Sequence, residues 1–211
     1  GKNSVITTAK PGAICIDHST IDPQGTKDIA AIMAGKKIAY VDAPVSGGVK
    51  AATEGTLVMM LGGADADVAK VQEIVKSYAK TITHIGAVGH GQVAKLCNQI
   101  AQVINIQGVA ESMRFAAANG ADLQKVFEAI SGGMAGSRML DLMGPKMVRR
   151  DFKAGIEARL HAKDFFLVKD AAKTANLDMP ALQTVALQLE KLMDAGWGYD
   201  DTSSLLKVLE A

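Results

Sequence analysis

The pattern of hydrophobic residues changes near residue 89, and this change constrains the fold more than any other feature. Before it, short apolar runs bounded by Gly or Pro alternate with helical stretches, which is typical of an α/β layer. The runs expected to be strands are 13–17, 38–45, 56–61 and 81–85, with helices at 23–35 and 66–79. After it, segments with a period of 3.6 residues replace them. The sequence therefore predicts two domains, 1–88 and 89–211.

The second domain is expected to be entirely helical. Its longest helical segment begins near residue 91 and ends at Asn119-Gly120, a pair that favours a helix stop. Asp122 is a suitable N-cap for the next helix, and Pro180 suits a first helical turn. The later helices are expected at 122–132, 156–175 and 180–195, with a short one after Asp201.

Composition excludes several classes of function. The 211 residues carry a formal charge of +1 and only 4% aromatic residues, so we expect no nucleic-acid partner. The apolar runs are too short and too interrupted for a signal peptide or membrane span, and we expect a cytoplasmic protein without membrane association. Cys15 and Cys97 lack a CxxC partner and are expected to be reduced. The four histidines lack metal-ligand spacing, so no metal site is expected.

The long helix contains the first candidate site. One of its faces has a polar residue at every third or fourth position: Lys95, Asn98, Gln102 and Asn105. Apolar residues cover most of the remaining circumference, which is typical of a buried helix. A polar stripe holding one cation is costly there unless it lines a cavity. Patterning alone leaves two interpretations of Lys95: a side chain that reaches solvent, or an ammonium that donates a proton to a reacting oxygen.

A second candidate site follows a predicted strand. The strand ends at Pro44 and gives way to Ser46, Gly47 and Gly48. A hydroxyl and exposed glycine N–H groups at the carboxyl end of a strand can bind a small anion. An ordinary turn is the alternative interpretation.

The third candidate is the pair Lys163-Asp164 within a predicted helix. These residues lie three and four positions after Leu160, so both are expected on the apolar stripe of the helix. A charge there requires a reason, either functional or a buried structural ion pair.

Four stretches together resemble the β-hydroxyacid dehydrogenases, the family of 3-hydroxyisobutyrate dehydrogenase and tartronate semialdehyde reductase. They are DHSTIDP at 17–23, DAPVSGG at 42–48 with GTL at 55–57, GHGQVAKLCN at 89–98, and KD at 163–164. Their order and spacing match the family over nearly the whole chain. The resemblance implies the C-terminal part of a Rossmann-type sheet followed by an all-α catalytic and oligomerisation domain. It also implies NAD or NADP as cofactor, a small carboxylic-acid substrate, and a homo-oligomer, either dimer or tetramer.

The resemblance also implies roles for individual residues. Lys95 would be the general acid that protonates the carbonyl oxygen during reduction, and the base in the reverse direction. The substrate-binding residues would be Ser46, Gly47, Gly48 and Asn98. The cofactor-binding residues would be Ser19, Thr20, Lys163 and Asp164, with Ser19 and Thr20 at the nicotinamide end.

Several functions remain open within this resemblance. The stretches 130–137 and 151–155 are more similar to tartronate semialdehyde reductases, so reduction of tartronate semialdehyde to glycerate is the first expectation. Oxidation of 3-hydroxyisobutyrate is an alternative, whereas the long C-terminal region of 6-phosphogluconate dehydrogenases is missing. A carboxylate-binding and oligomerisation module without turnover is another alternative. Imine reduction is disfavoured because Lys95 is retained. The exact substrate and the choice between NAD and NADP stay open.

The chain departs from the family pattern at the cofactor's pyrophosphate. Family members begin with a strand–GxGxxG–helix unit, and the near match at 132–136 follows a helix instead of a strand. We therefore expect that the first mononucleotide-binding half is missing, which leaves the activity of this chain alone open. Loss of that half would also expose a sheet edge and favour self-association.

Overall fold

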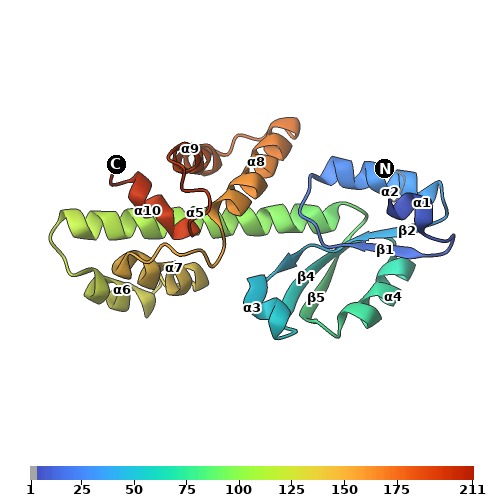
Figure 1. Ribbon diagram of the computed structural model, residues 1–211, viewed down its shortest axis with the longest axis horizontal. Coiled ribbons are helices and arrows are strands. Elements are labelled where there is room, and N and C mark those ends of the chain that lie inside the picture. The colour runs from blue at the N-terminus through green and yellow to red at the C-terminus, as the bar shows by residue number, and fades with distance from the viewer. Residues whose placement is uncertain (1–3) are drawn as a thin grey trace. The chain divides into compact units, whose positions relative to one another are not determined.

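The computed structural model describes residues 4–211, which divide into two compact units (Figure 1). Unit 1 ends at Cys97 and unit 2 begins at Asn98, so the boundary falls inside the long helix α5 (His90–Ala118). Unit 1 contains the strands, and unit 2 is almost entirely helical. This confirms the predicted fold class, part of a Rossmann-like sheet followed by a helical region.

Unit 1 is built on a mixed sheet. Its strands are β1 (Ile14–Asp17), β2 (Ala39–Asp42), β3 (Val45–Ser46), β4 (Leu57–Gly62) and β5 (Ala79–Gly86). β1 and β2 are parallel, as are β4 and β5, whereas β2 and β3 both pair antiparallel with β4. β2 and β3 pair with β4 in the same register. The strand predicted at 38–45 is therefore present as two strands, which are separated by Ala43-Pro44. Among the described residues, β1 pairs only with β2.

Helices cover both faces of this sheet. They are α1 (Val5–Thr8), α2 (Pro23–Ala34), α3 (Gly48–Thr53) and α4 (Asp65–Val75). Successive side chains of β2 point to opposite faces of the sheet and pack into two different hydrophobic cores. Tyr40 packs with Met33 of α2, whereas Val41 packs with Val68 and Val71 of α4. Figure 1 accordingly shows α2 and α4 on opposite sides of the strands. The predicted helix at 66–79 ends earlier, at Val75, because Ala79 already begins β5.

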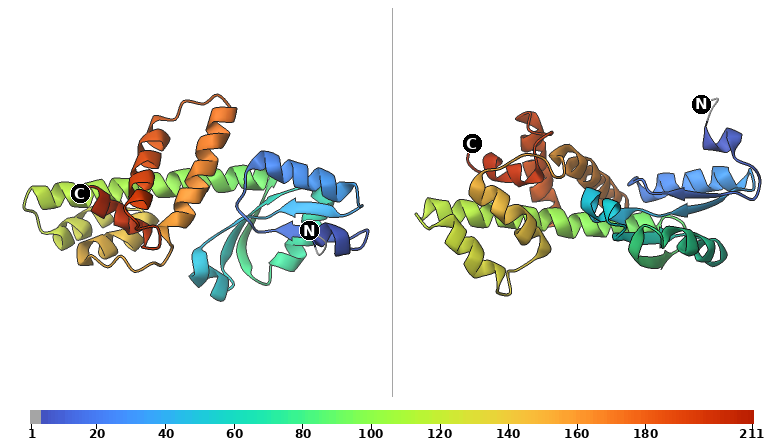
Figure 2. Two further views of the ribbon diagram at one scale, coloured as in Figure 1. Left: turned by 45° about the horizontal axis from the view of Figure 1, so that its top comes forward. Right: turned by 60° about the horizontal axis from the view of Figure 1, so that its bottom comes forward.

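Unit 2 packs short helices against the C-terminal part of α5 (Figure 2). They are α6 (Leu123–Ser131), α7 (Arg138–Arg149), α8 (Ala158–Thr174), α9 (Pro180–Asp194), the 3₁₀ helix η1 (Thr202–Ser204) and α10 (Leu205–Val208). The predicted cap is confirmed, since the Asp122 carboxylate accepts from the Lys125 N–H at 3.1 Å. No helix was predicted at α7, which holds despite its internal Pro145 because Leu140, Met143 and Met147 are buried.

The expectation that α5 is buried almost all round was wrong. Phe115 is 73% exposed and Val93 44%, whereas Val103, Ile106 and Met113 are completely buried. The helix therefore has one exposed side. No helix among residues 4–211 is long and apolar enough to cross a membrane.

The first turn of α5 is joined to the sheet at Asp42, the last residue of β2. This residue is completely buried, and its carboxylate accepts from the N–H groups of Gly89 (2.8 Å) and Gln92 (3.0 Å). The first amides of a helix lack partners inside it, and a carboxylate there also interacts favourably with the helix dipole. Burial raises the pKa of Asp42, and the hydrogen bonds from the backbone N–H groups offset part of that rise.

Glycines allow this close approach of helix and sheet. A Cβ atom on Gly91 would lie 2.5 Å from the Met60 carbonyl oxygen and 2.9 Å from that of Asp42. A Cβ atom on Gly62, at the end of β4, would lie 2.5 Å from Asp42 Oδ1. Only glycine fits at these positions without displacing the backbone.

In unit 2, the Asp201 carboxylate connects separate segments through hydrogen bonds and an ion pair. It is 1% exposed and accepts from the N–H groups of Gly155 (2.8 Å) and Ser203 (3.0 Å), and Lys146 Nζ lies 3.1 Å from its carboxylate. Burial opposes ionisation of this carboxyl group, but these partners outweigh burial and lower the pKa of Asp201.

We predict that a Gly91→Ala substitution destabilises the protein, because the new methyl group overpacks the junction. The expected loss in free energy of unfolding is about 1–3 kcal/mol. Gly108 lies in the same helix, and a Cβ atom there would meet nothing within 4 Å. Gly108→Ala should therefore stabilise by about 0.5–1 kcal/mol through helix propensity. Thermal unfolding followed by circular dichroism checks both, and shifts of equal sign would contradict the packing described.

We predict that Asp201→Asn lowers the free energy of unfolding at pH 7 by about 1–3 kcal/mol. A folded-state pKa below the unfolded value of about 3.9 means that ionised Asp201 stabilises the fold above pH ~4. That contribution is lost as the pH falls through the folded pKa, so the difference from wild type should shrink below pH ~4. Urea unfolding followed by fluorescence of Trp197, the one tryptophan of the chain, measures it. An equal difference at pH 3 and pH 7 would count against this role.

Candidate active site

The carboxyl ends of β1 and β2 form the edge on which the candidate residues of unit 1 gather. Asp17 and Asp42 are register partners, so the segments that follow them leave the sheet side by side. The loop after β1 contains Ser19 and Thr20, and the segment after β2 leads to Ser46. α5 starts at the same edge because Asp42 holds its first turn. Ligands of parallel α/β sheets usually bind at this end of the strands.

The side chain of Gln92 holds the loop after β1. It is completely buried, its Oε1 accepts from the Ile21 N–H (3.2 Å), and its Nε2 donates to the Ser19 carbonyl oxygen (2.8 Å). The Ser19 N–H also donates to Asp17 Oδ1 (2.9 Å). Ser19 and Thr20 are thus fixed between a strand and α5, with Ser19 exposed and Thr20 half-buried.

Lys95 follows Gln92 by one turn of α5. It is 9% exposed, so the interpretation of a side chain extended into solvent does not describe it. Burying an ammonium is costly unless polar groups compensate, and such sites are frequently functional.

The predicted anion-binding segment is an open turn. Ser46 ends β3 and is half-buried, whereas Gly47 and Gly48 are exposed. Their φ angles are 125° and 66°, which favour glycine, and a side chain on Gly47 would collide with Ala51. The turn therefore presents backbone and a small hydroxyl instead of bulky side chains.

The other predicted residues lie in unit 2. Asn98 Nδ2 donates to Gln99 Oε1 (2.8 Å), and Gln99 Nε2 donates to Asp164 Oδ2 (2.7 Å). Lys163 Nζ forms an ion pair with Asp164 Oδ1 at 3.0 Å. These four residues form one connected polar group.

One expectation about this pair was wrong. Asp164 is 7% exposed, but the side chain of Lys163 is 53% exposed, so only the carboxylate lies on the buried face. The error arises from Leu160, which is itself 43% exposed and does not mark the apolar stripe of α8.

Sequence reasoning assigned no role to Gln92, Gln99 or His161, which the structure places beside the candidate residues. Gln92 and Gln99 flank Lys95 in the chain, but neither amide reveals from its type alone that it is buried. His161 was counted only as an isolated histidine, although it is 3% exposed and hydrogen-bonded to Gln102.

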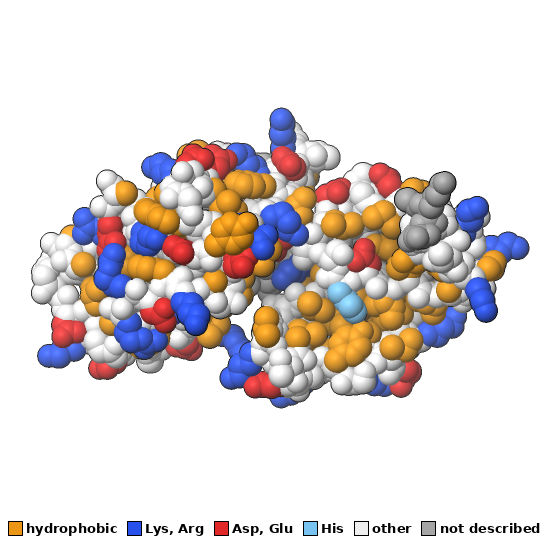
Figure 3. Space-filling view, in the orientation of Figure 1, with side chains coloured by type: hydrophobic (Ala, Val, Ile, Leu, Met, Phe, Trp, Pro, Cys, Tyr) orange, Lys and Arg blue, Asp and Glu red, His pale blue; other side chains and the backbone are white. Residues whose placement is uncertain are grey.

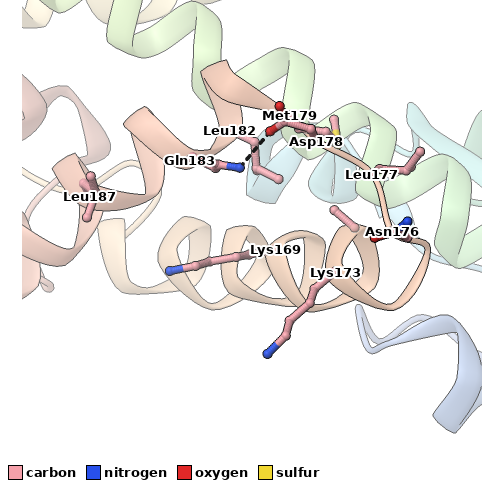
Figure 4. A pocket seen from close by; sticks show the side chains of 10 residues that line it. Lys169, Lys173, Asn176, Leu177, Asp178, Met179, Leu182, Gln183 and Leu187 are labelled. Carbon is pink, nitrogen blue, oxygen red and sulfur yellow. Dashed lines mark hydrogen bonds between the residues drawn. The ribbon is translucent and has the colours of Figure 1, made fainter.

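A separate groove of ≈ 600 Å³ lies at the α8–α9 hairpin (Figure 4). Its walls include Lys169, Lys173 and Leu182, and an amide-to-carboxylate hydrogen bond of 3.0 Å joins Gln183 to Asp178. None of the predicted site residues lines it, so we do not assign the chemistry there.

Ser19 and Thr20 are the residues expected at the nicotinamide end of NAD or NADP. The loop that contains them is fixed at the carboxyl edge of the sheet, where α5 also begins. No residue is assigned to the pyrophosphate of the cofactor, because the 211 residues contain no strand–GxGxxG–helix segment.

Comparisons with known proteins cover nearly the whole chain. Residues 1–86 match the profile described as the NAD binding domain of 6-phosphogluconate dehydrogenase. Residues 89–209 match the profile described as NAD-binding of NADP-dependent 3-hydroxyisobutyrate dehydrogenase.

Individual relatives and structures agree with these profiles. The 2-hydroxy-3-oxopropionate reductase of Escherichia coli K12 is 37% identical over 210 residues, covering 100% of this chain and 72% of the relative. Human mitochondrial 3-hydroxyisobutyrate dehydrogenase is 34% identical, covering 99% and 64%. The crystal structure of 3-hydroxyisobutyrate dehydrogenase from Salmonella typhimurium has a TM-score of 0.90 at 26% identity, covering 98% and 73%. The chain therefore belongs to the NAD(P)-dependent β-hydroxyacid dehydrogenases, the oxidoreductase family of 3-hydroxyisobutyrate dehydrogenase.

Proposed function

We propose that this protein reduces a small carboxylic semialdehyde to a hydroxy acid, with tartronate semialdehyde and glycerate as the first pair, and that Lys95 is the general acid. One observation carries the proposal: a buried ammonium lies one turn after the point where α5 is fixed to the carboxyl edge of the sheet. Identity of 37% to a 2-hydroxy-3-oxopropionate reductase supports this choice of substrate.

In this mechanism, Lys95 Nζ donates a proton to the aldehyde oxygen as that oxygen gains negative charge. In the direction of oxidation, the neutral amine takes the proton from the hydroxyl group. The Ser46 hydroxyl and the backbone N–H groups of Gly47 and Gly48 bind the carboxylate, and Asn98 orients the substrate. When bound, the reduced nicotinamide supplies the hydride.

The remaining candidate residues bind the cofactor in this proposal. Ser19 and Thr20, held by Gln92, contact its nicotinamide end, and Lys163 with its partner Asp164 also contacts the cofactor. None of these residues is assigned to the pyrophosphate of the cofactor.

A carboxylate-binding and oligomerisation module without turnover is the second candidate function. Surfaces suited to a second copy favour it. β1 has an unpaired side among the described strands, and Figure 3 shows apolar side chains gathered over unit 1. The exposed side of α5 also lines a groove of ≈ 420 Å³ with Ala101, Ile104 and Gly108.

We propose a homo-oligomer for both candidate functions. Light scattering that finds a monomer would argue against it.

We predict that Lys95→Ala lowers kcat for tartronate semialdehyde about 10²–10⁴-fold. Lys95→Arg keeps the charge but releases its proton far less readily, so it should be similarly slow while still binding glycerate. The assay follows NADH or NADPH oxidation by this chain, alone and fused to a strand–GxGxxG–helix unit of a relative.

The outcomes separate the two candidates. Turnover that disappears with Lys95→Ala supports the reductase. Glycerate binding by calorimetry without turnover, even in the fusion, would favour the binding module. Turnover that is unaffected by Lys95→Ala would show that Lys95 is not the general acid. Faster oxidation of 3-hydroxyisobutyrate than of glycerate would show that 3-hydroxyisobutyrate, not glycerate, is the preferred substrate.

A further inference from the structure

A chain of hydrogen bonds in unit 2 connects Asn98 with His161. Asn98 Nδ2 lies 3.2 Å from Gln102 Oε1, one turn further along α5. Gln102 Nε2 lies 3.2 Å from Nε2 of His161 on α8, and His161 Nδ1 lies 2.7 Å from Thr202 Oγ1 in η1. Burial increases along these hydrogen bonds. The amides of Asn98 and Gln102 are half-buried, His161 is 3% exposed, and Thr202 is completely buried.

Donors and acceptors must alternate along this chain, so each member fixes the next. The Gln102 oxygen accepts from Asn98, and its amide nitrogen therefore faces the imidazole as a donor. His161 Nε2 must then accept. This alternation requires a neutral ring with its proton on Nδ1, from which it donates to Thr202 Oγ1.

The same direction is imposed on Asn98 from a second side. Gln99 also offers Asn98 its carbonyl oxygen, because its amide nitrogen donates to the Asp164 carboxylate, which can only accept. Both glutamines therefore bind the nitrogen of the Asn98 amide. These two hydrogen bonds leave Asn98 Oδ1 to accept from another donor.

We infer that His161 is a positioning residue: through Gln102 it fixes the Asn98 amide so that Oδ1 accepts a hydrogen bond from a hydroxyl group of the hydroxy acid. This inference rests on the proposed function, in which Asn98 contacts the substrate. His161 itself touches no substrate. Its contribution is the acceptor nitrogen Nε2, without which Gln102 is free to rotate its amide and present a donor to Asn98.

Two substitutions separate the two nitrogens of the ring. In His161→Gln, the amide of the longer side chain reaches the place of Nε2 and restores the acceptor for Gln102. In His161→Asn, the shorter amide occupies the place of Nδ1 and serves Thr202 alone. Each variant keeps one of these two hydrogen bonds and loses the other, so their thermal stabilities should fall by similar amounts.

The two variants should differ in binding the hydroxy acid. We expect His161→Asn to weaken glycerate binding about 3- to 10-fold in calorimetry, the equivalent of one neutral hydrogen bond. KM should rise by the same factor with little change in kcat, and His161→Gln should stay near wild type. Equal binding by the two variants would overturn the inference.

A measurement on the wild-type protein tests the inference without any activity. ¹⁵N–¹H correlation spectra of the His161 ring show which nitrogen carries the proton. The expected result at pH 7 is a neutral ring protonated on Nδ1, and a proton on Nε2 would overturn the inference. If the spectra agree but glycerate does not bind to any form, the proposed function fails while the hydrogen-bond chain stands.

Discussion

The buried carboxylate of Asp42 is the interaction on which the geometry of unit 1 depends. It terminates a strand and binds the first amides of α5, so the helix begins where the sheet ends. A carboxylate at a helix N-terminus typically contributes about 0.3–1 kcal/mol and up to about 2 kcal/mol when partly buried. Its larger effect is geometric. Gln92 and Lys95 are placed by the same contact, and through Gln92 so is the loop with Ser19.

Helix α5 carries two kinds of polar group that serve one reaction in the proposed mechanism. Lys95 belongs to the unit that holds the sheet, whereas Asn98, one turn later, is oriented by side chains of unit 2. The proposed proton donor thus takes its position from a strand, and the amide proposed to orient the substrate takes its position from α8 and η1.

Local patterning predicted much of this. Gly and Pro around short apolar runs indicated the strands, and the recurrence of Lys95, Asn98 and Gln102 indicated one face of the long helix. The partners of that face were beyond prediction, because Asp164 and His161 are 65 and 59 residues from the amides that they bind. Helix α7 was missed because Pro145 and Gly144 argue against a helix locally, whereas packing of Gly144 on Phe127 retains it. The mixed direction of the strands likewise depends on pairing between distant segments.

Chemical rescue tests most directly whether Lys95 delivers the proton, on which the proposed mechanism depends. In Lys95→Ala, the truncated side chain leaves space where a small primary amine can bind. If Lys95 is the general acid, added methylamine or ethylamine should restore turnover of the fused, cofactor-competent protein in a saturable manner, with a rate that varies with the pKa of the amine. If amines of suitable size restore no activity while glycerate binding is intact, Lys95 is not the proton donor.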